Sequence, residues 1–276
     1  MNTVDVIFPA WPVYLYLNPD MGRRLLEPVF QYQQTSLYPN KWSIHDIGAS
    51  YPNATGHNDG GDESMPVEES GNMLIMALSY TRATKDLSLV ADNYNLLTQW
   101  TQFLVNDSLI PALQLSTDDF AGHLANQTNL AIKGIIGIRA MSEISSLLGK
   151  QGDAKKYLDI ATSYVPKWQK LATSNEGHLV LNYGSPSSWG LAYNLYADKL
   201  FQFKLFPQSI YDMQSGWYDD QGTEYGLALD SRHSYTKSDW IIFTAGTVLP
   251  YSRNTLISRV RDYIANGKNN APFSDW

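Results

Sequence analysis

Helical periodicity runs through most of the chain, and the expected helices come in pairs that are joined alternately by short and by long connections. Because each pair shares a short joint, such as TKD, GKQGD or LPYSR, its helices are expected to form an antiparallel hairpin. In GKQGD, Gly152 is expected to end one helix and Asp153 to cap the next, while Pro207 is expected to open another helix at its first turn. The expected helices span residues 21–34, 68–83, 87–104, 127–148, 153–173, 188–206, 236–248 and 252–265, with one more from 207 onward.

The connections between the pairs are long and irregular, and they cover residues 35–67, 105–126, 174–187 and 218–235. In a string of antiparallel helices every second connection falls at the same end, so these four segments are expected to share one face. The pattern predicts an all-α chain, an (α/α) toroid of helical hairpins in one domain over residues 1–276. About nine helices are expected, fewer than a closed ring of six hairpins needs, so the ring is expected to be incomplete or to belong to a larger chain.

The composition and charge of the chain limit the classes of binding partner that are expected. The net charge is −7 and no basic cluster is present, so nucleic acid is not an expected partner. No apolar run is long enough to cross a bilayer and the start of the chain lacks a signal peptide, so no membrane partner is expected. The absence of cysteine excludes disulfides and cysteine-ligated zinc. Eight Trp and eighteen Tyr favour a small polar substrate, because their rings combine a flat apolar face with a polar tip.

The segment HDIGASYPNATGHNDGGDESMPVEESGNM holds six carboxylates and two histidines directly before and into an apolar helix. Pro66 suits the first turn of that helix, which places Glu69 where unpaired N–H groups favour a negative charge. Glu69 is therefore a candidate base or anchor for a ligand ammonium group, and His45 and Asp46 are further candidates from the same segment. A calcium ion on NDGGDE is the competing interpretation, although the spacing does not fit an EF-hand.

Two other long segments hold the remaining candidates. Asp119 and His123 follow each other closely in the second segment, where Asp119 could also serve only as a helix cap. Arg232, Lys237 and Asp239 lie within DSRHSYTKSDW, a stretch that could equally be a salt-bridged loop. A site with charges of both signs suits a zwitterionic or polar substrate. No dinucleotide, P-loop, zinc-protease or serine-hydrolase motif is present, so no cofactor is expected, and no metal ligands are assigned.

At these residues the chain resembles the fungal glutaminase A type proteins, which are related to bacterial proteins of the six-hairpin glycosidase-like group. The resemblance covers essentially the whole chain and is carried by MNTVDVIFPAWPVYLYLNP, HDIGASYPNATGHNDGGDESMPVEESGNMLIMALSY, TDDFAGHLANQTNLAIKGI, SWGLAYNLYADKLFQFKLFP and LDSRHSYTKSDW. It implies a six-hairpin (α/α) toroid and, for the fungal members, secreted hydrolysis of L-glutamine to L-glutamate and ammonia. Family members carry a secretion signal and a β-rich region ahead of MNTVDV and continue past FSDW, so this chain is expected to be a fragment or a shortened member.

The leading hypothesis is a glutaminase-like amidohydrolase, in which one carboxylate activates water and another protonates the departing ammonia. Water is expected to be activated by Asp46, Glu69 or Asp119, and the leaving group is expected to be protonated by Asp239. The substrate carboxylate is expected to bind Arg232 or Lys237. The substrate pocket is expected to include His45, His123 and Trp189. A glycoside hydrolase with two carboxylates and a non-catalytic binding fragment remain as alternatives. Three N-x-S/T triplets, at Asn53, Asn106 and Asn126, are candidate glycosylation sites and suit an exported protein.

Overall fold

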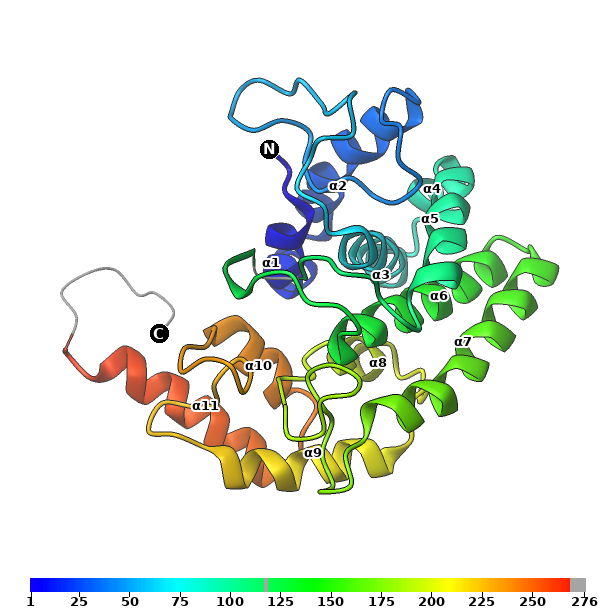
Figure 1. Ribbon diagram of the computed structural model, residues 1–276. Coiled ribbons are helices and arrows are strands. Elements are labelled where there is room, and N and C mark those ends of the chain that lie inside the picture. The colour runs from blue at the N-terminus through cyan, green and yellow to red at the C-terminus, as the bar shows by residue number, and fades with distance from the viewer. Residues whose placement is uncertain (117–118, 269–276) are drawn as a thin grey trace. The chain divides into compact units, whose positions relative to one another are not determined.

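The computed structural model of the 276-residue chain describes residues 1–116 and 119–268, apart from the side chain of Asp119. The predicted all-α class is confirmed, since the described residues form helices and a few isolated β-bridges but no strand (Figure 1). The elements are α1 (Val4–Leu17), α2 (Pro19–Gln34), α3 (Pro66–Thr84), α4 (Ser88–Asp92), α5 (Tyr94–Asp107), the 3-10 helix η1 (Asp119–Ala121), α6 (Thr128–Leu147), α7 (Gln151–Ala172), α8 (Leu195–Phe201), α9 (Gln208–Gln221), α10 (Ser238–Ala245) and α11 (Pro250–Ala265).

The helices divide into two compact units. Unit 1 contains the described residues of 1–126 and 133–164, and unit 2 contains those of 127–132 and 165–268. The expectation that all four long segments share one face therefore stays a prediction, because the first two belong to unit 1 and the last two to unit 2. The single toroid domain also stays a prediction. None of the described helices is long and apolar enough to span a bilayer.

Helix α3 is the central element of unit 1 and packs against α1, α2, α4 and α5. Its sequence is apolar nearly all round, which predicts a helix buried on most sides, and every residue from Val67 to Thr81 is indeed buried. Even the two acidic residues of its first turn, Glu68 and Glu69, have no solvent exposure. The core of unit 1 therefore surrounds a helix that carries charged groups at its N-terminal end.

Aromatic side chains form much of the core of unit 2. The rings of Tyr193 and Trp240 stack with their centroids 4.2 Å apart, and Phe243 meets Trp240 edge-on at 5.2 Å. Trp168 of α7 meets Phe206 edge-on at 5.0 Å. These contacts join helix α10 to the loop before α8, and α7 to the chain that leads into α9, so the aromatic residues fill the core of this unit.

Helix α1 is not among the expected helices. Its sequence contains Pro9 and Pro12, and proline inside a helix removes a backbone hydrogen bond. The helix nevertheless forms, and its buried residues Val4, Phe8 and Trp11 follow a helical spacing toward α3. Tertiary packing here outweighs local propensity. With this helix and a break in another, the described residues hold eleven α-helices, so the expectation of about nine was wrong.

The expected helix over residues 87–104 is two helices, α4 and α5, separated at Asn93. The Asn93 side chain donates to the carbonyl of Leu89 at 2.8 Å and accepts from Gln34 at 2.6 Å. Asparagine favours such breaks because its amide competes with the backbone for hydrogen bonds.

The expected helix over residues 188–206 is also wrong in extent, because only α8, Leu195–Phe201, is helical. Residues before α8 pair with the last long segment instead: Leu191 N–H donates to Leu229 O and Ser231 N–H donates to Trp189 O. After α8, the Asp198 carboxylate accepts the N–H groups of Leu205 and Phe206, so that stretch turns away from the helix axis.

The hairpin of α6 and α7 is confirmed, but its joint is not the one expected. Gly149, with a φ of +73°, follows the end of α6, in a conformation that glycine adopts without strain. Helix α7 already begins at Gln151, so Gly152 and Asp153 lie in its first turn and neither ends nor caps a helix. The Asp153 carboxylate instead accepts the hydroxyl of Tyr94 at 2.8 Å.

Candidate active site

The loop between α2 and α3 is irregular but well anchored next to the N-terminal end of α1. The backbone N–H of His45 donates to Asp62 at 3.0 Å, and the carbonyl of His45 accepts the N–H of Val4 at 2.9 Å. This second bond fixes the first turn of α1, which includes Asp5, beside the loop. Two segments that are distant in sequence thus bring their charged side chains together.

Asp46 lies between the two histidines of this loop. Its carboxylate accepts from His45 Nδ1 at 2.9 Å, from His57 Nε2 at 3.0 Å and from the backbone N–H of Gly48 at 2.6 Å. Burial alone would raise the pKa of Asp46, but the hydrogen bonds from the two histidines outweigh it and hold that pKa well below its usual range. Asp46 is therefore a fixed negative charge that orients both imidazole rings.

The other ring nitrogen of His45 faces carboxylates from two further segments. Its Nε2 atom is 3.3 Å from Asp5 Oδ1 and 3.7 Å from Glu63 Oε2. Burial lowers the pKa of His45, but the hydrogen bonds to Asp46 and Asp5 raise it by more, to about 11. The imidazole is thus surrounded by acidic groups on both sides.

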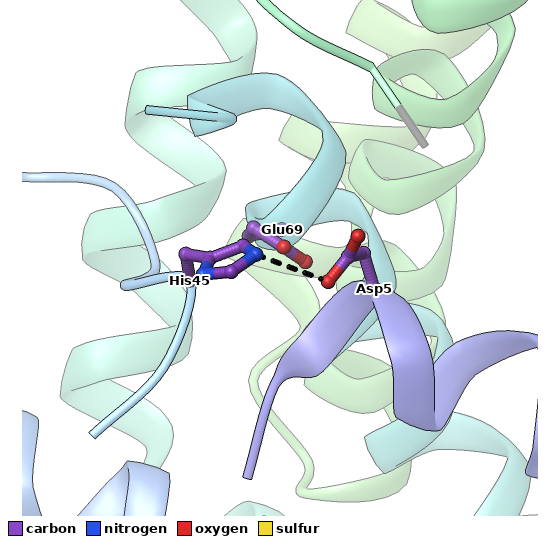
Figure 2. Close-up of side chains that lie close together, drawn as sticks. All are labelled: Asp5, His45 and Glu69. Carbon is purple, nitrogen blue, oxygen red and sulfur yellow. Dashed lines mark ion pairs between the residues drawn. The ribbon is translucent and has the colours of Figure 1, made fainter. Parts of the chain in front are cut away.

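Glu69 completes this group from the first turn of α3. Its side chain has no solvent exposure and points toward His45 and Asp5, as Figure 2 shows. One ligand atom from each of these three residues lies within 4.8 Å of the other two. Burial raises the pKa of Glu69 well above its usual value, and the nearby charge of Asp5 adds to the increase. We call Asp5, His45, Asp46 and Glu69 the acid–imidazole cluster.

Hydrogen bonds from within the core hold Glu69 in place. Its Oε2 atom accepts from Asn72 at 3.2 Å, while its buried Oε1 atom has no hydrogen-bond partner among the described residues. Asn72 in turn accepts from Lys133 of α6 at 2.6 Å, and Lys133 pairs with Glu68 at 3.1 Å. Burial lowers the pKa of Lys133, which the charge of Glu68 partly offsets.

Two predicted residues of the second long segment belong to the same unit. Asp119 begins η1, but its side chain lies outside the described residues. His123 is exposed and precedes Leu124, whose N–H donates to Gln114 O at 3.1 Å. Because the side chain of Gln114 accepts the N–H of Val67 at 3.0 Å, this segment is tied to the first turn of α3. The role predicted for each residue stays a prediction.

The other predicted residues lie in unit 2, so whether they share a site with the acid–imidazole cluster of unit 1 stays a prediction. Arg232 makes two hydrogen bonds to the buried carboxylate of Asp230, at 2.7 and 3.0 Å, and Lys237 lies 3.5 Å from Asp239. Both cations therefore already have an acidic neighbour, as in a salt-bridged loop. The half-buried Trp189 belongs to the segment that pairs with residues 229–231.

The carboxylates of NDGGDE are held within the loop. Asp59 accepts the N–H of Gly61 at 3.0 Å, and Asp62 accepts from Tyr38 at 2.8 Å as well as from His45 N–H. In the part of the chain that the structure describes, the group with metal-ligand geometry is Asp5, His45 and Glu69 instead. Asp5 and Lys133 were not singled out from the sequence. The signal for Asp5 was missed because the helix that carries it was not expected.

The three glycosylation triplets differ in accessibility. Asn53 and Asn106 are exposed, while Asn126 is half-buried, and its backbone N–H donates to Pro111 O. A glycan needs an exposed side-chain amide. The first two positions are therefore the better candidates.

Comparison with known proteins relates the whole chain to one family. The model of the glutaminase A six helical-hairpin domain matches residues 1–276. The chain is 48% identical to Glutaminase A of Aspergillus oryzae, with 100% of this chain and 40% of that protein covered. It is 37% identical to a probable glutaminase of Arthroderma benhamiae, with 99% of this chain and 42% of that protein covered. The chain therefore spans less than half the length of these curated relatives.

Solved structures show the same architecture at low sequence identity. A glycosidase variant in complex with glucose has a TM-score of 0.67 at 13% identity, over 96% of this chain and 74% of that one. A wild-type glycosidase has a TM-score of 0.63 at 13% identity, over 94% and 73% of the two chains. Identity this low shows the fold alone. Together with the domain model, these matches confirm the predicted fold class, an (α/α) toroid of helical hairpins.

Proposed function

The chain belongs to the glutaminase A six helical-hairpin family, and we propose that it hydrolyses the side-chain amide of L-glutamine to L-glutamate and ammonia. Two relatives that match nearly all of the chain are named as a glutaminase and a probable glutaminase. The matched region is 40% and 42% of those proteins, so their activity is carried to this chain as part of the proposal.

The observation that supports this reaction best is the position of the Glu69 carboxyl group. It is fully buried at the start of α3 and faces His45 and Asp5, and its Oε1 atom has no hydrogen-bond partner among the described residues. Buried polar atoms without a partner are uncommon, and they are often found where a ligand binds. The acid–imidazole cluster is therefore the place where we expect the substrate amide and the attacking water to meet.

In the proposed step the oxygen of a water molecule attacks the side-chain carbonyl carbon of glutamine. The cluster takes a proton from this water, the C–N bond breaks, and the nitrogen receives a proton and leaves as ammonia. The carbon keeps the water oxygen as a carboxylic acid, which releases its proton to solvent to give the carboxylate of L-glutamate. Asp46 serves this step indirectly, because its hydrogen bonds orient His45 and His57.

The roles of the remaining residues are part of the proposal. Asp239 protonates the leaving nitrogen and Arg232 or Lys237 binds the α-carboxylate, while His123 and Trp189 line the substrate pocket. Asp119 is a second candidate for activating water. Each role rests on the chemistry of the residue and can be tested by substituting one side chain at a time.

Incubation of the purified chain with L-glutamine tests the proposal, with ammonia release as the readout. Glu69→Gln is expected to lower the rate by about 10²–10⁴-fold, the usual contribution of a positioned acid or base. Glu176→Gln is the matched control, because Glu176 is exposed and lies outside the cluster. Ammonia release that Glu69→Gln leaves unchanged would refute the assigned site.

A glycoside hydrolase is the second candidate, because Asp5 and Glu69 place two carboxyl groups in one cluster and such enzymes use a pair of carboxyl groups. Incubation with a panel of oligosaccharides separates the two functions. Sugar release without ammonia would overturn the glutaminase proposal, and inertness toward both substrate sets in a chain that melts cooperatively would support a non-catalytic binding role.

We also propose that the protein is exported and carries N-linked glycans at Asn53 and Asn106, whose side chains are exposed. Expression behind a secretion signal in a eukaryotic host, followed by enzymatic removal of glycans, should reveal a mass shift. Asn53→Gln and Asn106→Gln should each remove part of that shift. An unchanged mass after glycan removal would refute the assignment.

A further inference from the structure

Asp5, His45 and Glu69 come from three separate segments and point at one another. Asp5 lies on α1, His45 on the following long loop and Glu69 on α3, and one ligand atom of each lies within 4.8 Å of the others (Figure 2). The set consists of an imidazole nitrogen and two carboxylate oxygens. Glu69 is fully buried, and no described residue donates a hydrogen bond to its Oε1 atom. A buried carboxylate oxygen in that position calls for a partner.

We propose that Asp5, His45 and Glu69 bind a divalent transition-metal cation of the Zn²⁺ or Mn²⁺ type. Imidazole and carboxylate together are ligands that suit these ions. Metal–ligand bonds of about 2.0–2.2 Å place neighbouring ligand atoms about 3.0–3.4 Å apart, so atoms of this set that are as much as 4.8 Å apart must move closer together when the ion binds. Three protein ligands leave coordination positions open for water or substrate, as in catalytic sites.

The surroundings of His45 are those of a metal-binding histidine. Its Nδ1–H donates to Asp46 at 2.9 Å, so Nε2 is the nitrogen that faces Asp5 and Glu69. Asp46 is itself held by the N–H of Gly48 at 2.6 Å. Metal-ligating histidines commonly donate their second N–H to a carboxylate, which fixes the ring and strengthens the ligand.

The same set disfavours calcium and magnesium. Ca²⁺ takes six to eight oxygen ligands and Mg²⁺ takes an octahedron of oxygen atoms, whereas this set includes a nitrogen at its centre. Glu63 supplies a fourth carboxylate at 3.7 Å from His45 Nε2, and it is partly exposed.

This inference adds a bound metal to the proposed active site. Only the catalytic role of the metal rests on the proposed function. A bound cation polarises an amide carbonyl and lowers the pKa of bound water, so the cluster would activate water through the metal. Metal binding itself is independent of that chemistry. The two proposals can therefore fail separately.

The test begins with the full chain stripped by a chelator and dialysed against Zn²⁺, Mn²⁺ or Ca²⁺, with bound metal measured by elemental analysis. We expect about one Zn²⁺ or Mn²⁺ per chain, no retained Ca²⁺, and a higher melting temperature with the bound ion. Co²⁺ gives a second readout, because its visible absorption reports nitrogen and oxygen ligands directly. Failure of the wild-type chain to retain Zn²⁺ or Mn²⁺ would overturn the proposal.

Substitutions of single residues test whether the ion binds at this cluster. Asp5→Asn and Glu69→Gln should abolish stoichiometric binding, and Asp46→Asn should weaken it by about 10–100-fold, as expected of a residue that orients a ligand. Asp159→Asn and Glu176→Gln are the matched controls, since both residues are exposed and distant in sequence from the cluster. Binding that survives both ligand substitutions in variants with a normal melt would assign the ion elsewhere and overturn the proposal. Glutamine hydrolysis by a metal-free chain would remove the catalytic role of the ion and leave the proposed function intact.

Discussion

Lys133 and Glu68 form an ion pair of 3.1 Å in which neither side chain is exposed to solvent. The ammonium group of Lys133 also lies 3.4 Å from the centre of the Phe8 ring and donates to Asn72. Burying two charges is costly unless each is compensated. This pair therefore couples α6 to the first turn of α3 and, through Asn72, to the carboxyl group of Glu69.

Lys133→Met should lower the free energy of unfolding by about 3–5 kcal/mol, because it leaves the charge of Glu68 buried without its cation. Urea denaturation of the wild type and the variant measures this loss. The double variant Lys133→Met with Glu68→Met should be more stable than the single one, since both charges are then gone. A double variant less stable than the single one would contradict this explanation.

Gly48→Ala should destabilise the loop that carries His45 and Asp46. Gly48 has a φ of +151°, and an added Cβ would lie 2.3 Å from the carbonyl oxygen of Asn53. We expect a loss of about 1–3 kcal/mol, the usual cost of a strained backbone position, together with slower glutamine hydrolysis. Gly152→Ala is the control, because it has open space within α7 and should gain ~0.5–1 kcal/mol. Equal melting temperatures for the two variants would rule out the strain argument.

The residues of α3 show which parts of the fold the sequence could predict. Its run from Pro66 to Thr84 is apolar on nearly all sides and too long for a strand, which is enough to assign a buried helix. Helix α1 could not be assigned, since Pro9 and Pro12 argue against a helix locally and only packing on α3 overrides them. The helix expected over residues 188–206 was wrong in extent because the backbone before α8 pairs with residues 229–231, a contact that the local sequence does not reveal.

Only some residues of the candidate site could be predicted from the sequence. His45, Asp46 and Glu69 stood out from the sequence because they lie in an acidic loop that leads into an apolar helix. Asp5 did not, because its place beside His45 depends on a bond from Val4 N–H to the His45 carbonyl across the sequence. Long-range backbone contacts of this kind leave no local pattern.

Tyr218 should make stability fall with rising pH in the alkaline range. Burial raises the pKa of its hydroxyl to about 12, partly offset by the hydrogen bond from the backbone N–H of Ala192 and by the nearby side-chain amide of Gln214. Between pH 10 and 12 the unfolded chain loses this proton while the folded chain keeps it, so stability present below pH 10 is lost progressively. In Tyr218→Phe the free energy of unfolding, from urea titrations at several pH values, should decline less steeply over that range. Parallel slopes for the two proteins would remove Tyr218 as the cause.

Asp239 gives the sharpest test of the residues predicted in unit 2. If it protonates the departing ammonia, Asp239→Asn should lower the rate of glutamine hydrolysis by about 10²–10⁴-fold, with little change in melting temperature. The ion pair with Lys237 at 3.5 Å is half-exposed, so its loss alone should cost at most about 1 kcal/mol. Lys237→Met breaks the same pair but keeps the carboxylate, and because Lys237 is itself a candidate for binding the substrate carboxylate, its own effect should fall on KM. Asp239→Asn should instead lower kcat, the parameter that reports proton transfer. If both variants lower kcat equally, the ion pair matters and the proton transfer assigned to Asp239 is wrong.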